Sequence, residues 1–373
     1  MAIPLGRTVA SCAAGIITVA SIDNAVEALT ADSVPPFAAS FSGASRFDQA
    51  TFGGRMRKMM LACDPTLLVY TPSHIRQLKA ELDGFKATCQ ANGGVPPQPL
   101  SAQQNRKLWE SQRIVSSALH PDTGELIPHP FRMSGYLPFN GPICVGQIAS
   151  ASTGSLLFWN WANQSQNALV NYFNRNASSP MANETLAKSY AGAVCAALSV
   201  AYGLSTVIKR RYDAATAARF LKFVAFPSSV LASSLNCYIV RSPEIDSGVD
   251  LLDEDYKVIA MPNGERSSAA AKKGVYETVA SRAILQFPVY FIPPALMATL
   301  PFLKNALVRN PALSVPMTLY LLLVSFGVGL PAAIAIFPQF GTIDVSELEA
   351  PFQKIVVPGT TEYRRVFNYN KGL

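Results

Sequence analysis

The sequence predicts an all-α, polytopic membrane protein with about five transmembrane helices and a small helical soluble region near the N-terminus. The chain has 373 residues, a mean hydropathy of +0.21 and only 15% charged residues, which argues against two or three soluble domains. Five stretches lack any charged residue. Each can hold the roughly 20 apolar residues with which a helix crosses a bilayer core of ~30 Å.

Residues 1–44 are predicted to be an extension outside the membrane bundle. Val9–Ala20 is a short apolar run that resembles the core of a secretory signal peptide. Acidic residues follow it at Asp23, Glu27 and Asp32, and arginine is scarce for a mitochondrial presequence. We expect either a poorly ordered extension or a weak targeting segment, and the residues leave both open.

Residues 45–132 are predicted to form the small soluble helical region, because charges of both signs occur throughout it. Two helices are expected, around Pro72–Ala91 and Ser101–Leu119, separated by the turn-rich sequence NGGVPPQP. Ser101 is an N-cap candidate, with Gln104 three residues later as in a capping box. With few large apolar residues, a region of this size is expected to pack on the bundle rather than fold alone.

Residues 133–341 are predicted to be the transmembrane bundle, and residues 342–373 a C-terminal tail. The five charge-free stretches are Met133–Asn174, Ser189–Ile208, Phe223–Val240, Ala283–Leu303 and Val315–Gly341. Prolines interrupt the first and the fourth, so we expect both spans to be kinked or broken. Such breaks are either ordinary kinks, or exposed helix ends that hold a carboxylate and an ammonium group in the membrane.

The charges of the loops predict an orientation. Basic residues flank the second and the fourth connection between spans, at Lys209, Arg210, Arg211, Arg219, Lys222, Lys304 and Arg309, whereas the third connection is acidic. Basic short loops stay on the side from which insertion starts. We therefore expect the soluble region to share its side with the basic loops, and an odd number of spans to place the C-terminus on the other side.

Asparagines recur along one stretch of the first span. Asn160, Asn163, Asn167, Asn171 and Asn174 are three or four residues apart, which places them on one face of a helix. We call this face the asparagine stripe. Burying one amide without a partner costs roughly 4 to 8 kcal/mol on the water-to-cyclohexane reference, so the stripe cannot face lipid.

Three interpretations of the asparagine stripe remain open. It lies at the membrane surface as an amphipathic helix, it joins helices through hydrogen bonds, or it lines a wet cavity that a polar solute crosses. The lack of charge favours a neutral or zwitterionic solute over an ion or a phosphate.

The motif HPDTGE at residues 120–125 precedes the first span. Its proline, aspartate and glycine suit a tight turn. The functional alternative is that His120, Asp122 and Glu125 form a gate or a proton-sensitive latch at the pore mouth.

Several partners and activities are excluded. The net charge of +7 is spread over loops and tails, which suits contact with anionic lipid headgroups such as cardiolipin and not nucleic acid. The six cysteines are scattered without metal-ligand spacing, so we expect neither a metal nor a cofactor. The spans show no nucleophile, base and orienting group together, and no phosphate-binding G-x-x-x-x-G-K-[ST] loop occurs, so we expect no enzyme and no use of ATP.

Several motifs resemble the sideroflexin family in order and spacing. They are DQATFGGR at 48–55, HPDTGE at 120–125, FWNWANQSQNALVNYFNR at 158–175, Asn236-Cys237, IPP at 292–294, FPQ at 337–339 and the terminal RRVFNYNKGL. The resemblance covers about nine-tenths of the chain, from Ser45 to Leu373. The chain departs from the family in its N-terminal extension, in Phe173 where threonine is usual, and in one extra residue near the end.

The resemblance implies a five-span protein of the mitochondrial inner membrane with its N-terminus in the matrix. It implies transport of serine and related small neutral amino acids into the matrix for one-carbon metabolism. The alternative is a structural or accessory subunit or assembly factor of respiratory-chain complexes, or an iron or haem homeostasis protein, without transport activity.

We predict a carrier that works by alternating access, with substrate-binding and gating residues but no catalytic residue. The substrate-binding residues are Asn160, Asn163, Gln164, Ser165, Asn167, Asn171, Asn174 and Asn236. The gating residues are His120, Asp122, Glu125, Pro293 and Pro294.

Overall fold

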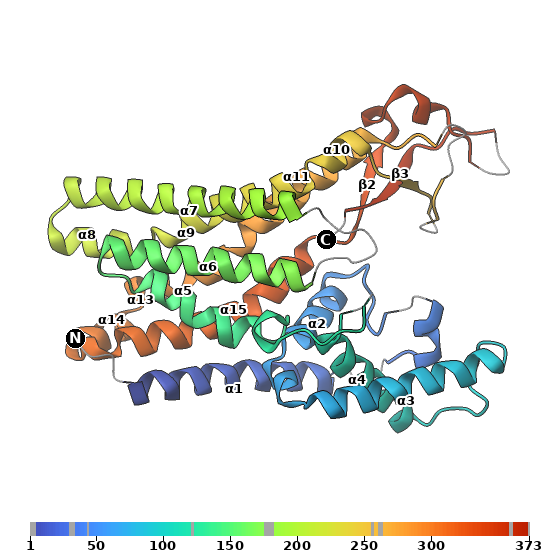
Figure 1. Cartoon of the computed structure of the whole chain (residues 1–373), viewed down its shortest axis with the longest axis horizontal. Helices are drawn as coiled ribbons and strands as arrows, with labels where there is room; N and C mark the ends of the chain where they lie inside the picture. Colours follow the sequence, from blue (N-terminus) through green and yellow to red (C-terminus); the bar gives the residue numbers. More distant parts are fainter. Residues whose placement is uncertain are drawn as a thin grey trace.

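The computed structural model describes residues 5–29, 34–42, 45–120, 123–174, 183–254, 257–259, 264–357 and 361–371. Most of these residues are helical, and the longer helices run along the long axis of an elongated bundle (Figure 1). The predicted all-α membrane fold is confirmed. Its helices are α1 (Leu5–Leu29), α2 (Phe52–Cys63), α3 (Pro72–Ala91), α4 (Ala102–Ala118), η4 (His129–Phe131), η5 (Tyr136–Asn140), α5 (Gly141–Ile148), α6 (Thr153–Phe173), α7 (Asn183–Arg211), α8 (Ala214–Leu221), α9 (Ala225–Arg241), α10 (Pro243–Ser247), α11 (Ser268–Leu285), α12 (Phe287–Tyr290), α13 (Ile292–Thr299), α14 (Pro301–Arg309) and α15 (Ser314–Ile336).

Fewer helices meet the requirements of a membrane span than the five predicted. Within the described ranges, three stretches are long and apolar enough, namely Glu184–Arg211, Ala214–Ser247 and Pro311–Ile336. A fourth is obtained if Ser268–Thr299 and Pro301–Arg309 count as one span with a bend of 79°. This is the predicted fourth span. Its prolines begin α12, α13 and α14 at their first turns, where a missing N–H costs nothing, so the helix breaks there.

The predicted first span is not a single crossing but a helical hairpin. Residues pair in opposite order along its two arms. Gln147 Nε2 donates to Asn160 Oδ1 over 3.1 Å, and Tyr136 OH donates to Asn167 Oδ1 over 2.5 Å. Ser152 starts the second arm as an N-cap that accepts from the amide of Ser155. A run without charges therefore identified apolar surroundings correctly but could not show that the chain turns back.

The hairpin overturns the predicted orientation of the loops. Arg55 Nε, on α2, donates to the carbonyl of Ala335 over 2.8 Å, which places the soluble region at the C-terminal end of α15. Lys304 and Arg309 lie on α14, before the N-terminus of α15. The 23 residues of α15 separate these two ends by about 35 Å. The soluble region and this basic connection therefore lie at opposite ends, contrary to the prediction.

The other basic connection lies at the same end as α14. Lys209 Nζ donates to Thr153 Oγ1 over 2.8 Å, at the start of α6. At the other end of α6, Asn174 Nδ2 donates to the carbonyl of Phe131 over 2.8 Å. Both basic loops thus face away from the soluble region.

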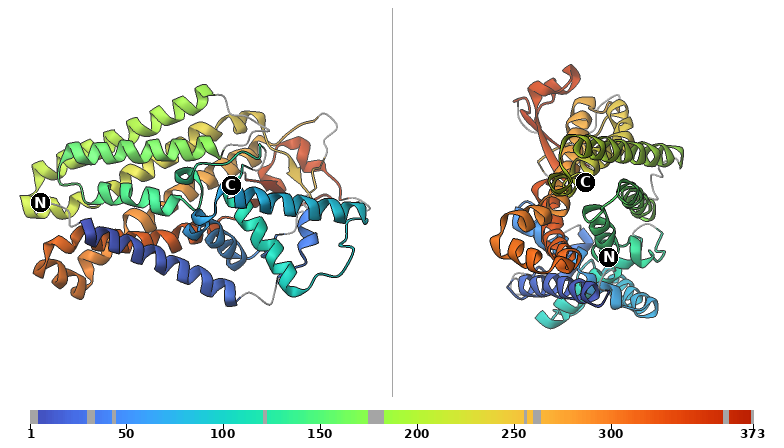
Figure 2. Two further views of the ribbon diagram at one scale, coloured as in Figure 1. Left: turned by 60° about the horizontal axis from the view of Figure 1, so that its bottom comes forward. Right: turned by 90° about the vertical axis from the view of Figure 1, so that its left-hand side faces the viewer.

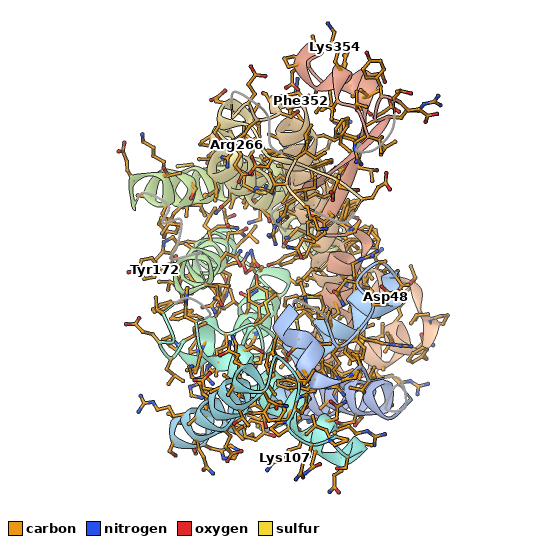
Figure 3. All side chains as sticks on the ribbon, turned by 90° about the vertical axis from the view of Figure 1, so that its right-hand side faces the viewer. Asp48, Lys107, Tyr172, Arg266, Phe352 and Lys354 are labelled. Atoms are coloured by element: carbon orange, nitrogen blue, oxygen red, sulfur yellow. The ribbon has the colours of Figure 1, made fainter. Side chains whose placement is uncertain are left out.

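The C-terminal tail returns to the soluble region, so its predicted placement on the other side is also wrong. Strands β1 (Leu251–Leu252), β2 (Phe340–Asp344) and β3 (Val366–Asn370) form an antiparallel sheet in the order β1-β3-β2. The sheet joins the acidic connection to the tail directly after α15. Figure 3 views the molecule from this end, where Asp48 and Lys107 of the soluble region and Arg266 and Lys354 surround the bundle. The cause is the hairpin, which returns the chain to the end from which it entered.

Residues 5–29, for which the sequence left a poorly ordered extension and a weak targeting segment both open, form helix α1 along α15 (Figure 2). A Cβ atom built on Gly15 would lie 2.9 Å from Leu323 Cβ, and one on Gly327 would lie 2.4 Å from Val19 Cγ2. Because the numbering rises together on both helices, α1 and α15 run parallel. The N-terminus of α1 therefore lies at the end of the basic loops. Small residues permit this close packing of two apolar helices.

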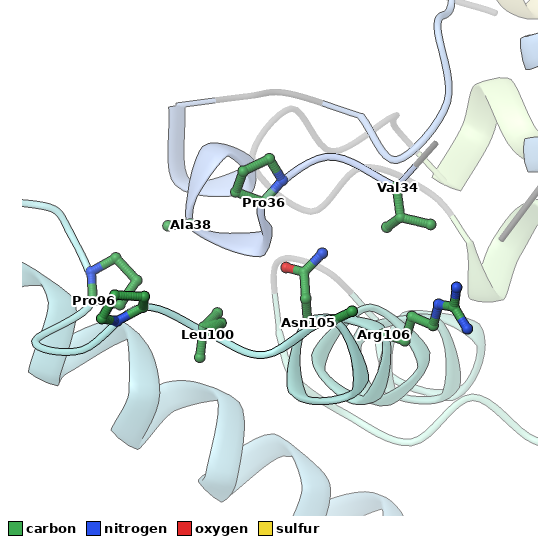
Figure 4. Close-up of a pocket in the computed structure, with 9 residues that line it drawn as sticks. Val34, Pro36, Ala38, Pro96, Leu100, Asn105 and Arg106 are labelled. Atoms are coloured by element: carbon green, nitrogen blue, oxygen red, sulfur yellow. The ribbon is translucent and has the colours of Figure 1, made fainter. Parts of the chain in front are cut away.

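Residues 45–132, which the sequence predicts to be the soluble region, contain the two predicted helices, α3 and α4. Ser101 and Gln104 form the predicted capping box. A surface pocket of about 540 Å³ lies between residues 34–38 and 96–106. Figure 4 shows residues that line it. The amide of its Asn105 is occupied by the chain itself, since it accepts from the amide of Phe37 and donates to the carbonyl of Pro35. The pocket lies outside the bundle that holds the asparagine stripe.

Candidate functional site

A cluster of uncharged polar side chains lies inside the bundle, where α5, α6, α9 and α12 meet. None of its members is more than 3% exposed, although each sits on an apolar helix. We call them the amide cluster: Asn140, Gln147, Asn160, Asn163, Gln164, Ser228, Ser229 and Tyr290. Buried polar groups of this kind must be paired with one another or with a ligand, since leaving them unpaired costs free energy.

Both polar atoms of the Asn160 side chain have hydrogen-bond partners. Its Nδ2 donates to the carbonyl of Leu156 over 2.8 Å, and its Oδ1 accepts from Gln147 Nε2 over 3.1 Å. Ser228 Oγ lies 2.8 Å from the same oxygen and 2.7 Å from the carbonyl of Ala197. This one side chain thus ties α6 to α5 and α9, which corresponds to the helix-joining interpretation of the asparagine stripe.

A second chain of contacts reaches the broken span. Asn140 Nδ2 lies 3.5 Å from Cys144 Sγ, and the same sulfur lies 3.1 Å from the hydroxyl of Tyr290. Tyr290 is the last residue of α12, and the buried Pro293 and Pro294 follow at the first turn of α13. The interruption between α12 and α13 at these prolines therefore lies next to the amide cluster, whereas the bend of 79° comes later, between α13 and α14.

Three buried amide oxygens of the cluster have no hydrogen-bond partner among the described residues. They belong to Asn140, Gln147 and Asn163. The antiparallel register of the hairpin, which pairs Tyr136 with Asn167, places Asn140 at about the level of Asn163. An unpaired buried acceptor costs about 1 to 3 kcal/mol, so each of these oxygens is a position at which a hydrogen-bond donor would be bound.

The outer half of the asparagine stripe is partly exposed and paired with neighbouring segments. Ser165 Oγ lies 2.9 Å from the hydroxyl of Tyr190 on α7. Asn167 accepts from Tyr136, and Asn174, which is exposed, donates to the carbonyl of Phe131. The side chain of Asn171 lies outside the described part of α6.

Asn236 does not join the other predicted substrate-binding residues. It lies on α9, two turns beyond Ser228, and is half-buried. Within the described part of the chain, the structure shows no hydrogen bond between Asn236 and the asparagine stripe.

The predicted gate forms a tight turn. The amide of His120 donates to the carbonyl of Glu125 over 2.8 Å, and the amide of Gly124 donates to the carbonyl of His120 over 2.9 Å. Gly124 has a φ of +68°, which favours glycine. His120 Nδ1 accepts from the amide of Thr123, while Glu125 is exposed. Pro121 and Asp122 lie outside the described residues. This geometry matches the turn interpretation and does not test a gate.

Sequence reasoning missed the residues that complete the amide cluster from α5, α9 and α12. Asn140, Cys144 and Gln147 are spaced by four and three residues, so they lie on one face of a helix. That spacing within an apolar run is the same signal that identified the asparagine stripe. Ser228 and Tyr290 carried no local signal, because only the packing of α9 and α12 brings them close.

The chain was compared with known proteins. The family model described as "Sideroflexins" matches residues 42–373. Sideroflexin-5 of Homo sapiens is 37% identical over 343 residues, which cover 91% of this chain and 94% of the relative. A sideroflexin of Dictyostelium discoideum is 36% identical over 350 residues, covering 92% of this chain and 100% of the relative. Sideroflexin-1 of Homo sapiens is 32% identical over 332 residues, covering 88% and 96%. No solved structure matches the chain.

Proposed function

The chain belongs to the sideroflexin family, and on that premise we propose that it carries serine and related small neutral amino acids across the mitochondrial inner membrane, for use in one-carbon metabolism. The amide cluster is the observation that supports this proposal. It is uncharged, buried among apolar helices, and contains three amide oxygens without a partner among the described residues.

The chemistry of the cluster suits a small zwitterion with a hydroxyl group. The unpaired oxygens of Asn140 and Asn163, which the register of the hairpin puts at about one level, would accept hydrogen bonds from an ammonium group, and neighbouring hydroxyls would donate to the substrate. A carrier needs only modest affinity. Binding at about 1 mM corresponds to roughly 4 kcal/mol, which three or four net hydrogen bonds of about 1 kcal/mol supply.

Alternating access requires a part of the bundle that moves and a closed state in between. The break between α12 and α13 at Pro293 and Pro294 lies next to the cluster, so rocking of this broken span would open the cluster to one side or the other. The burial of Asn160, Asn163 and Gln164 fits a closed state. His120, Asp122 and Glu125 would then act at the mouth near the soluble region.

The proposed orientation follows from the loop charges. Basic connections remain on the side of insertion, so the loops with Lys209 and Lys304 face the matrix, together with the N-terminus of α1. The basic residues of α8 and its flanks would contact anionic headgroups such as those of cardiolipin. Residues 45–132 and the C-terminal tail would lie on the opposite side of the membrane.

Uptake into proteoliposomes tests the proposed function. Purified protein is reconstituted, and labelled serine, alanine, cysteine and glycine are followed side by side. We expect uptake of serine that exceeds that of empty vesicles and saturates with concentration. Wild-type vesicles that take up none of the four amino acids would refute the carrier.

The alternative is an accessory role in respiratory-chain complexes, and one observation favours it. Asn160 is fully paired between three helices, which is what a packed structural bundle needs. The soluble region and the sheet at one end would then form the docking surface. Comigration of the wild-type protein with a respiratory complex on native gels, together with no uptake of amino acids, would favour this role.

A further inference from the structure

Among the residues that the structure describes, Arg132 is the largest fully buried side chain, with 1% of its surface exposed. It follows η4 and precedes η5, where the chain enters the hairpin. Its Nε donates to the carbonyl of Ile127 over 2.7 Å. Its Nη1 and Nη2 atoms are buried and have no hydrogen-bond partner within the described ranges. The Nε of this guanidinium therefore bonds to the backbone, whereas its two Nη groups bond to none of the described residues.

Three other arginines with little exposure each have a carboxylate partner. Arg113 pairs with Asp64 and Glu110, Arg241 with Glu244, and Arg364 with Glu254. No such ion pair involves Arg132 among the residues that the structure describes. A buried charge without a counter-charge costs several kcal/mol, and a guanidinium stays protonated in a protein, so it calls for an anion.

The shape of the unused half indicates which anion fits. The two Nη groups of a guanidinium form a planar fork that binds both oxygens of a carboxylate at once. The burial of Arg132 favours a small ligand that enters the protein. A phosphate that remains attached to a lipid in the bilayer would have to be drawn into the interior.

Arg132 lies beside the asparagine stripe. Gln166 Nε2 donates to the carbonyl of Pro130 over 2.7 Å, and Asn174 donates to that of Phe131. Four residues after Arg132, Tyr136 donates to Asn167. The segment that holds Arg132 is thus bound along the outer half of α6, while the unpaired amide oxygens lie deeper in the same hairpin.

We propose that Arg132 binds the carboxylate of the transported amino acid at the soluble-region end of its path. The proposal rests on the proposed carrier function and deepens it, because it names the group that distinguishes an amino acid from other small polar solutes.

Serine and ethanolamine provide the test, because they differ only by the carboxylate. In wild-type proteoliposomes, unlabelled serine should inhibit uptake of labelled serine at a much lower concentration than ethanolamine does. In Arg132→Gln, the KM for serine should rise about tenfold to a hundredfold, the loss expected for one charge-assisted contact. The inhibitory concentrations of serine and ethanolamine should converge.

Two further variants control for stability and for charge. Arg132→Lys keeps the charge without the planar fork, so it should retain part of the discrimination. Arg76→Gln removes an exposed arginine of α3 and should change neither KM nor discrimination. If Arg132→Gln does not fold, the test is made with Arg132→Lys. If Arg132→Lys then discriminates between serine and ethanolamine as well as the wild type does, the proposal is overturned.

Each other outcome has a defined meaning. Undiminished discrimination in Arg132→Gln with a lower melting temperature would make Arg132 a purely structural residue and overturn the proposal. Loss of stabilisation by cardiolipin-containing vesicles with unchanged discrimination would assign the guanidinium to a lipid phosphate and also overturn it. Wild-type vesicles without any uptake would refute the carrier function itself, which is a separate result.

Discussion

Asn160 and Asn163 lie one helical turn apart on α6, yet their surroundings differ. Asn160 is bonded to Gln147 and Ser228, whereas the side-chain oxygen of Asn163 is buried without a partner in the described part of the chain. The first has the environment of a structural residue and the second that of a binding residue. The two positions therefore form a matched pair.

Asn160→Ala should destabilise the protein, because it leaves the side-chain N–H of Gln147 without its partner inside the bundle, whereas Ser228 keeps the carbonyl of Ala197. We expect the free energy of unfolding to fall by about 1 to 3 kcal/mol. Asn163→Ala should cost little stability but lower serine uptake several-fold. Melting in detergent and uptake by proteoliposomes check both. If Asn163→Ala only lowered the melting temperature and left uptake unchanged, Asn163 would also be a packing residue.

His129 should titrate below its ordinary pKa of 6.5. Desolvation by burial lowers the pKa most, and the charge of Arg132 lowers it further, while a hydrogen bond to the backbone of Leu68 opposes both. The native state then binds fewer protons than the unfolded chain. Stability should consequently fall as the pH drops below about 6.5, until the folded state is protonated as well.

The chain has three histidines, so isotope-labelled histidine should give resolvable NMR signals. One signal should titrate below 6.5 and disappear in His129→Gln. In Arg132→Gln this signal should titrate at higher pH, because one of the two causes that lower the pKa is gone. No movement of the signal would contradict the coupling between the two side chains.

At the level of helices, the contact between α1 and α15 is the clearest departure from the sequence-based expectation. Val19 is 2% exposed and belongs to the same hydrophobic core as Leu322, Leu323 and Phe326. The residues before 42 lie outside the match to the family model, so this contact is an addition to the part of the chain that resembles the family.

Gly327→Ala should disturb this contact, because the added Cβ would lie 2.4 Å from Val19 Cγ2. Overpacking of this kind costs about 1 to 3 kcal/mol, so the melting temperature should fall. Adding Val19→Ala should restore most of the lost melting temperature, because it removes the side-chain atoms that the new Cβ would meet. Gly203→Ala on α7 is the matched control, because its Cβ would meet nothing within 4 Å. If Gly327→Ala and Gly203→Ala lowered the melting temperature equally, the contact between α1 and α15 would not be the cause of the loss.

For the whole molecule, the structure predicts which segments share a side of the membrane. Single cysteines replacing Ser73 or Lys354 in a cysteine-free background should react with an impermeant maleimide from the same side. A cysteine replacing Arg219 should react only from the other side. Protection of Ser73→Cys under conditions that expose Lys354→Cys would contradict the arrangement.

Local patterns in the sequence were sufficient for the helical membrane fold, the capping box of α4, the broken fourth span and the polar face of α6. Each depends on residues a few positions apart, whose spacing determines both the helix and the face on which a side chain lies. The resemblance to the family also depends on local motifs, so it could be seen in the sequence, and the family model confirmed it.

Only the tertiary structure decided that residues 136–173 turn back and that α1 lies along α15. It also decided that Asn160 is paired, while the side-chain oxygen of Asn163 and the two Nη atoms of Arg132 have no partner among the described residues. Periodicity defines the face of a helix but not the neighbour that covers it. That neighbour comes from distant parts of the chain, as Ser228 does for Asn160, 68 residues away. The pairing of a buried polar group, and with it the difference between packing and binding, is therefore a property of the folded chain.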